Sequence, residues 1–144
     1  MQHEASEGRY RAIIESTPDA VIVANRDGVI GLWNGGAERI FGFSADEAVG
    51  RSLDLIVPER LRQRHWEGYR RVMHTGQTRY GTELLAVPAV RKDGERLSIE
   101  FTVALLWSAD GELTGIAAIV RDVTARWQRE QELLKRLAAL ETGT

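Results

Sequence analysis

The segment from Glu95 to Trp107 constrains the fold most, because apolar and polar residues alternate over most of its length. A period of two is typical of a strand that buries one face. Glycine-containing turns at 91–94 and 108–112 flank the segment, so we expect it to pair antiparallel with a neighbour on each side. The expected inward residues are Leu97, Ile99, Phe101, Val103 and Leu105.

Four other segments have the composition of strands, and together they predict the fold class. They lie at 20–24, 29–33, 79–90 and 113–120. Helical patterns separate the second from the third, including one that Ser44 opens as a capping box with Glu47. Pro88 indicates a bulge or an edge position in the third strand. The sequence therefore predicts an α+β fold, a five-stranded antiparallel sheet with helices on one face.

Helical segments are expected at both ends of this domain. The predicted division is a linker helix at 1–17, the folded domain at 18–124 and an amphipathic helix at 125–144. Apolar residues at steps close to three and four form a seam on the C-terminal segment: Val123, Trp127, Leu133, Leu134, Leu137 and Leu140. Burial of this seam in a parallel coiled coil would make a homodimer. A bundle with the N-terminal helix, or packing on the same domain, would also bury it.

Composition excludes several classes of protein. The net charge of -2 and the pI near 5.9 give no reason to expect a nucleic-acid or membrane partner. No apolar run approaches the roughly 18 residues of a membrane span, and no leader segment precedes the domain, so we expect a cytoplasmic protein. The absence of cysteine excludes disulfides, thiolate catalysis and covalent c-type haem. No common catalytic motif is present, so we expect no enzyme.

The helical pattern at 58–76 carries the candidate site, because it places His65 on an apolar stripe. The other members of that stripe are Leu61, Tyr69 and Val72. His74 points to the opposite side. A buried imidazole needs a hydrogen-bond partner or a metal, since an unpaired ring nitrogen costs about 1–3 kcal/mol. From the residues alone, His65 can be either a core histidine with a hydrogen-bond partner or a metal ligand.

Four motifs are spread along the domain: the run from Ile30 to Asn34, AERIFGFSADEAVG at 37–50, RKDG at 91–94 and GIAAIVRDVT at 115–124. Together they resemble the PAS domain family over about residues 6–124. The predicted order of elements is also the order of that fold. The resemblance implies that Asp122 and Thr124 anchor the start of a signalling helix through side-chain hydrogen bonds.

Within that family, RQRHWEGYRR at 62–71 resembles the haem-binding PAS domains of FixL-type oxygen-sensing histidine kinases. The resemblance implies that His65 is the axial ligand to the iron of a b-type haem (iron protoporphyrin IX). It also implies that Arg71 and Arg79 stand near the propionates. The implied cofactor-binding set is completed by Tyr69, Tyr80, Leu85, Phe101 and Val103.

One position departs from the FixL-type pattern: Leu85 stands where those sensors carry a distal arginine. An apolar wall cannot stabilise the partial negative charge on oxygen as a cationic donor does. Of the diatomic gases O2, CO and NO, we therefore expect CO or NO to be held better than O2, unless Tyr80 turns its hydroxyl inward.

The function expected from this resemblance is a gas-sensing module of a two-component or similar signalling protein. It would relay its signal through the C-terminal helix to a covalently linked output domain, such as a histidine kinase or a diguanylate cyclase. The alternative is a PAS domain without haem that binds another small ligand or serves as a dimerisation module, with His65 held by a backbone carbonyl.

Overall fold

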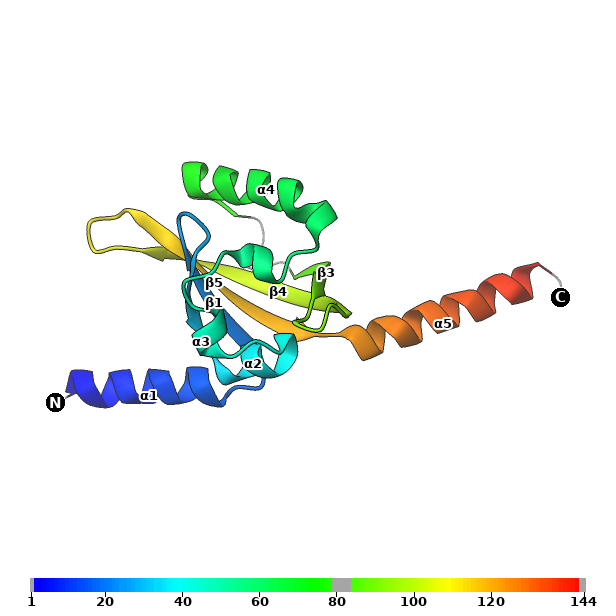
Figure 1. The fold of residues 1–144 in the computed structure, drawn as a ribbon, viewed down its shortest axis with the longest axis horizontal. Helices are drawn as coiled ribbons and strands as arrows, with labels where there is room; N and C mark the ends of the chain where they lie inside the picture. The colour runs from blue at the N-terminus through cyan, green and yellow to red at the C-terminus, as the bar shows by residue number, and fades with distance from the viewer. Residues whose placement is uncertain (1, 79–83, 143–144) are drawn as a thin grey trace.

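A five-stranded antiparallel sheet forms the centre of the molecule (Figure 1). The computed structural model describes residues 2–78 and 84–142. The strands are β1 (Ala20–Asn25), β2 (Ile30–Trp33), β3 (Leu85–Val90), β4 (Arg96–Trp107) and β5 (Leu113–Asp122), in the spatial order β2-β1-β5-β4-β3. The last strand therefore lies in the middle and joins the first hairpin to the second.

Three helices and two short 3-10 turns connect β2 to β3, and all of them except the second 3-10 turn contribute buried residues to the core on the sheet's inner face. They are α2 (Gly35–Phe41), α3 (Ala45–Ala48), η1 (Leu53–Leu55), η2 (Glu59–Leu61) and α4 (Arg62–Thr75). This is the predicted α+β architecture. None of the helices in the described ranges is long and apolar enough to cross a membrane.

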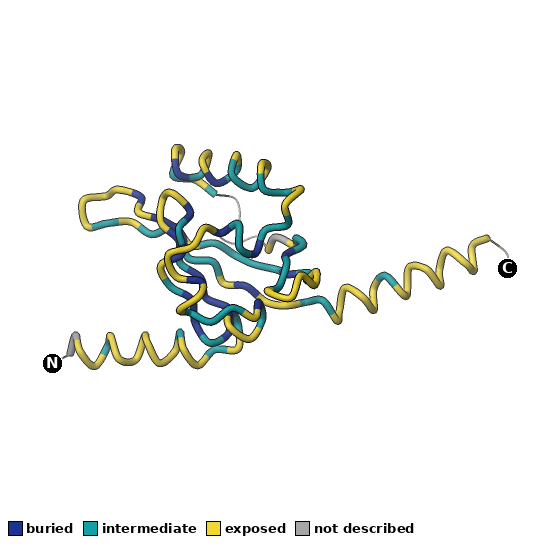
Figure 2. Tube along the Cα trace, in the orientation of Figure 1, coloured by how far each residue is buried: buried dark blue, intermediate teal, exposed yellow. Residues whose placement is uncertain are grey.

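Two helices lie outside this layered body: α1 (Gln2–Ser16) and α5 (Thr124–Glu141). They project from the sheet in opposite directions (Figure 1). Figure 2 shows that both are exposed along most of their length, whereas the buried residues gather in and above the sheet. No residue of α5 is buried, so its apolar side chains are not covered by the domain.

Asn34 organises the point where α1, β1 and α2 meet, and its side chain is fully buried. Its Oδ1 atom accepts hydrogen bonds from the backbone N–H groups of Val21 (2.8 Å) and Ala37 (2.9 Å). Its Nδ2 atom donates to the carbonyls of Ile14 (2.6 Å) and Asp19 (3.1 Å). One side chain therefore caps α2 and holds two neighbouring elements.

The predicted capping box is present at the start of α3. Ser44 Oγ accepts from the N–H of Glu47, and the Glu47 carboxylate accepts from the N–H of Ser44. Lys92, in the turn between β3 and β4, forms an ion pair with the same carboxylate. The hydrogen bond from Lys92, followed by the one from the Ser44 backbone, lowers the pKa of Glu47 to about 2.

The junction between β5 and α5 is held by the side chains that the resemblance implied. Thr124 donates its N–H to Asp122 Oδ1 (2.9 Å), and Thr124 Oγ1 accepts from the N–H of Ser98 in β4 (3.0 Å). Arg121 also binds Asp19 at the start of β1 (3.2 Å). The first turn of α5 is thus attached to the central part of the sheet.

Two sequence-based boundaries differ from the structure. The helix predicted from residue 58 begins as the 3-10 turn at 59–61 and becomes α-helical only at Arg62. The third strand begins at Leu85, and residues 79–83 of its predicted range lie outside the described residues.

The inward stripe of the long helix also differs from the prediction. The buried residues of α4 are Tyr69 and Met73, whereas Leu61, His65 and Val72 are only partly buried. Tyr69 is thus the predicted member of the stripe that is buried. Trp66 packs on Gly28 and bonds Asp54, which turns the face with Trp66, Tyr69 and Met73 toward the core.

Substitution of Asn34 by alanine should lower the free energy of unfolding by about 3 kcal/mol, because it leaves the buried N–H of Val21 without an acceptor and removes the cap of α2. Urea unfolding measures this value. Ser44→Ala, which removes an exposed cap, is the control and should cost about 1 kcal/mol. An equal decrease in the free energy of unfolding in the two variants would show that Asn34 only caps α2, and would contradict its role in holding β1.

Candidate functional site

The middle of α4 is attached to the turn between β1 and β2 and to η1. Tyr69 donates its hydroxyl to the carbonyl of Asn25, and Trp66 donates Nε1–H to Asp54 Oδ1 at 2.7 Å. The Trp66 ring lies directly against Gly28, where an added Cβ atom would lie 2.1 Å from its Cη2 atom. These three contacts fix the position of α4 at the level of His65.

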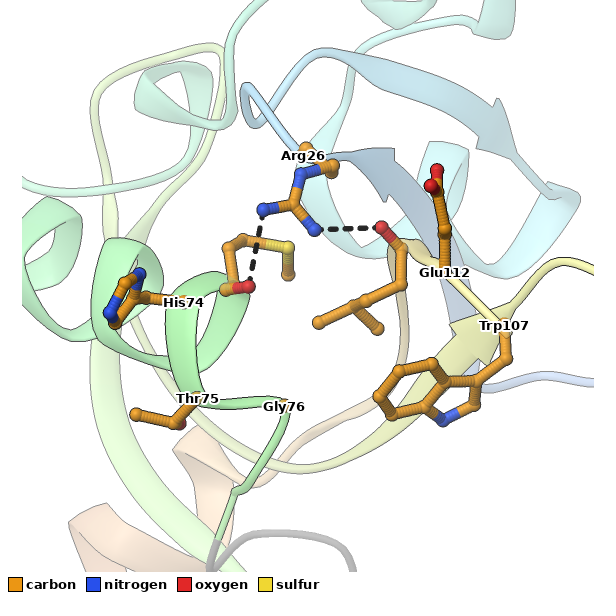
Figure 3. Close-up of a pocket in the computed structure, with 8 residues that line it drawn as sticks. Arg26, His74, Thr75, Gly76, Trp107 and Glu112 are labelled. Atoms are coloured by element: carbon orange, nitrogen blue, oxygen red, sulfur yellow. Dashed lines mark hydrogen bonds between the residues drawn. The ribbon is translucent and has the colours of Figure 1, made fainter. Parts of the chain in front are cut away.

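The C-terminal end of α4 is held by Arg26, which comes from the same turn. Its guanidinium donates to the carbonyls of Met73 (3.2 Å) and Leu113 (2.8 Å), as Figure 3 shows. A pocket of about 480 Å³ lies here, and His74 and Trp107 are among its lining residues. This pocket contains His74 rather than His65, so it is not the site that the sequence predicted.

His65 is a partly buried residue of α4. Its ring is 4.7 Å from the ring of Trp66, nearly perpendicular at 76°, and 5.9 Å from the ring of Tyr69. Its Nδ1 atom is buried and has no hydrogen-bond partner among the residues described. A buried polar atom without a partner calls for an explanation, such as a ligand that the protein normally holds.

The electrostatic surroundings of His65 favour a neutral ring. Burial lowers the pKa of His65 below its ordinary value of 6.5, and the negative charge of Asp54 offsets this only in part. The imidazole is therefore uncharged at neutral pH, and a neutral imidazole is the form that binds metals. Tyr69, beside it, is also protonated, since burial raises its pKa to about 12.

The inner face of β4 is less buried in its middle than the alternating pattern predicted. Leu97 and Ile99 are buried, as expected. Phe101, Val103 and Leu105 pack against the core but keep part of their surface exposed. Because α4 is fastened to the β1–β2 turn, the apolar middle of β4 is incompletely covered.

The structure brings only part of the predicted set together. Tyr69 contacts His65, and Phe101 and Val103 lie on the inner face of β4. Arg71 is exposed on α4.

Three predicted positions have no described side chain. Arg79 and Tyr80 lie outside the described residues. Leu85 begins β3 opposite Phe101 in the strand register, and its side chain is also outside the described set.

Sequence reasoning missed Trp66 and Asp54. Their hydrogen bond joins residues 12 positions apart, and Gly28, which Trp66 approaches closely, lies still farther away along the chain. The only sequence signal was a bulky aromatic residue next to His65. Gly28 itself reads as an ordinary turn glycine.

The residues present fit one axial ligand to a haem rather than a metal site built from several side chains. No group of three or more histidine, aspartate or glutamate side chains that could hold a metal ion occurs in the described ranges. An axial haem site needs a single neutral imidazole beside apolar surface. His65 supplies that imidazole.

A family model described as "PAS fold" matches residues 14–128. Curated proteins similar to the chain include an uncharacterized protein of Azorhizobium caulinodans, 34% identical over 140 residues (96% of this chain and 19% of the relative). Sensor protein FixL of Bradyrhizobium diazoefficiens is 31% identical over 127 residues (88% and 25%). Oxygen sensor protein DosP of Escherichia coli is 23% identical over 137 residues (95% and 17%). The chain thus spans a quarter or less of the length of these relatives.

Solved structures with the same fold include a PAS domain from Colwellia psychrerythraea, with a TM-score of 0.72 and 21% identity, covering 84% of this chain and 98% of that one. An RNA-binding Light-Oxygen-Voltage receptor gives a TM-score of 0.76 and 24% identity, covering 92% of this chain and 37% of the receptor. Because both identities are below 25%, the similarity to these structures shows a shared fold only.

The free energy of unfolding should decrease as the pH falls below about 6.5, because the unfolded chain then takes up a proton on His65 that the folded chain resists. The stabilisation is complete above the unfolded pKa and is lost as the pH passes down through the lower folded pKa. Urea unfolding between about pH 5 and 7.5 measures the slope. His65→Gln should flatten this slope relative to the unmodified chain. An unchanged slope in His65→Gln would contradict the assignment.

Proposed function

This chain belongs to the PAS-fold family, and from that premise we propose that it is a haem-binding sensory module of a larger signalling protein. Its relatives include proteins named as the sensor FixL, the oxygen sensor DosP and the signal transduction histidine kinase AtoS of Escherichia coli. The similarity to FixL and DosP supports a diatomic gas as the signal. The similarity to the kinase AtoS supports a kinase-type output domain outside this sequence.

The observation that carries the proposal is the state of His65. The ring is neutral at physiological pH, partly buried, and has a buried nitrogen without a partner in the described part of the chain. Nδ1 makes no hydrogen bond to a backbone carbonyl of the described residues, which is the contact that would hold this histidine in a PAS domain without haem. Metal ligation by the same ring does account for a histidine kept neutral at this position.

When bound, haem supplies an iron with a coordination position for a diatomic gas. The part of this chain is to bind and orient that group. His65 would hold it from α4, and the incompletely buried Phe101 and Val103 offer apolar surface. Arg71 is exposed and free of the core, and with Arg79 it would reach the propionates through charge-assisted hydrogen bonds worth about 1.5–3 kcal/mol each.

The choice among O2, CO and NO rests on the residue opposite the histidine. Leu85 at the start of β3 offers no hydrogen-bond donor where FixL-type sensors carry arginine. A site of this kind favours CO or NO over O2, because only O2 gains strongly from a cationic donor. The resemblance also assigns Tyr80 to the site, and a Tyr80 hydroxyl turned inward would change that order.

The output runs through α5, whose apolar side chains have no cover in the monomer. Leu133, Leu134 and Leu137 are each more than half exposed, and Leu140 is 72% exposed. Repeated apolar residues of this spacing are typical of helices that pair. A second copy of the chain is the partner proposed here, since two identical seams bury one another in a parallel homodimer.

Haemin added to the purified chain should produce a Soret absorption band, and His65→Ala should abolish it. The matched control is His74→Ala, which removes the exposed histidine of the same helix and should leave the band unchanged. An absorption titration measures both. A band that survives in His65→Ala with undiminished affinity would contradict ligation by His65, and the absence of a band in the unmodified chain would favour the PAS domain without haem.

Leu137→Glu should convert the dimer to a monomer, because it places a charge in the middle of the paired seam. The control is Lys135→Glu, which also introduces a glutamate but on the charged side of α5. This variant should leave the dimer intact. Analytical ultracentrifugation distinguishes the two masses. A monomer in the unmodified chain at high concentration would rule out pairing through α5.

A further inference from the structure

The indole of Trp66 occupies a slot with two fixed walls. On one side is Gly28, so close that an added Cβ atom would lie 2.1 Å from Cη2 and 2.2 Å from Cζ3 of the ring. On the other is Asp54, which accepts the Nε1–H of Trp66 at 2.7 Å. A ring that is held by contact at one end and by a hydrogen bond at the other cannot rotate without losing one of them.

The two walls of this indole slot belong to one rigid unit. The carbonyl of Gly28 accepts a hydrogen bond from the N–H of Leu53 at 3.0 Å, and Leu53 is the neighbour of Asp54 in η1. Gly28 itself has a φ of 77°, a left-handed conformation that suits glycine. The turn between β1 and β2 and the 3-10 turn η1 therefore hold the slot together.

The indole in turn bounds the imidazole of His65. The two rings are 4.7 Å apart and meet edge to face at 76°, a favoured geometry for aromatic pairs. Tyr69 completes the cluster at 5.4 Å from Trp66 and 5.9 Å from His65, and its hydroxyl is tied to Asn25. The imidazole thus has aromatic neighbours with fixed positions.

This arrangement replaces the usual way of orienting a ligating histidine. Such a histidine ordinarily donates its second ring N–H to a carboxylate or a backbone carbonyl, which sets the ring orientation. Nδ1 of His65 has no such partner in the part of the chain that is described. The orientation of the ring must therefore come from its packing.

We propose that Trp66 is the positioning residue of the haem site and that it orients the imidazole of His65 from the slot formed by Gly28 and Asp54. The inference rests on the proposed function as far as haem is concerned. The orientation of the ring is a property of the chain itself and can be measured without haemin.

The test uses Gly28→Ala, because the new methyl group and the indole cannot occupy the same space. The control is Gly111→Ala. Gly111 has a similar φ of 82° and closes a similar turn between two strands, but nothing lies within 4 Å of its Cβ position. Both variants carry the same backbone strain, and only the first displaces Trp66.

NMR spectra of the haemin-free protein supply the first measurement. The ring protons of His65, assigned by comparison with His65→Ala, should shift in Gly28→Ala and stay in place in Gly111→Ala, because a displaced indole changes the ring-current field at the imidazole. The second measurement is haemin affinity, which should fall about 10–100-fold in Gly28→Ala, as when the support of a metal ligand is lost. Equal resonances and equal affinities in the two variants would overturn the proposal.

A second pair of variants tests the proposal independently, in case the Gly28→Ala chain does not fold. Asp54→Ala removes the acceptor of the indole N–H, whereas Asp54→Asn removes the charge and keeps an acceptor oxygen. The His65 resonances should shift in Asp54→Ala and return toward their original positions in Asp54→Asn. Equal shifts in both would indicate an effect of charge and contradict positioning through Trp66.

A failure of the proposed function gives a different result from a failure of positioning by Trp66. If His65→Ala binds haemin as tightly as the unmodified chain, ligation by His65 is wrong and Trp66 has no role toward haem. The resonances of the haemin-free variants would still decide whether Trp66 orients the imidazole.

Discussion

The attachment of α4 to the turn between β1 and β2 determines what the rest of this domain can do. Tyr69 is bonded to Asn25, and Trp66 packs on Gly28, so the helix is fixed to the first hairpin. Apolar residues of this hairpin, such as Ala24 and Ile30, are fully buried, whereas the middle of β4 keeps partly exposed apolar side chains. An imidazole carried by such a helix is removed from bulk water but is not sealed in a packed core. That combination is what a ligand-binding sensor requires.

The same turn also lies on a short route from α4 to the C-terminal helix. Arg26 joins the end of α4 to Leu113, the first residue of β5. β5 is bonded along its length to β1 and β4, and it leads directly into α5, where Ser98 and Thr124 hold the first turn. These hydrogen bonds form a continuous route along which a displacement of α4 would reach the base of α5. This geometry suits a relay to an output domain.

Local patterns predicted much of the fold, and tertiary contacts determined the remainder. The Ser44–Glu47 capping box and the order of strands and helices along the chain depend on neighbours in sequence, and both were found. The alternation in β4 was found in burial only at Leu97 and Ile99. The buried face of α4 was predicted correctly at Tyr69 but not at Met73, because the contacts of Trp66 with Gly28 and Asp54 set the orientation of the helix. Trp66 could not be identified as a support for His65, since its slot is assembled from segments far apart in the chain.

The central claim is that the chain binds haem through one particular imidazole of the three that it contains. A crystal structure of the chain grown with haemin tests it most directly. The account predicts iron bonded to a ring nitrogen of His65, with the porphyrin against the inner face of β4. Iron bonded to His3 or His74, or a porphyrin lying outside the domain, would contradict it.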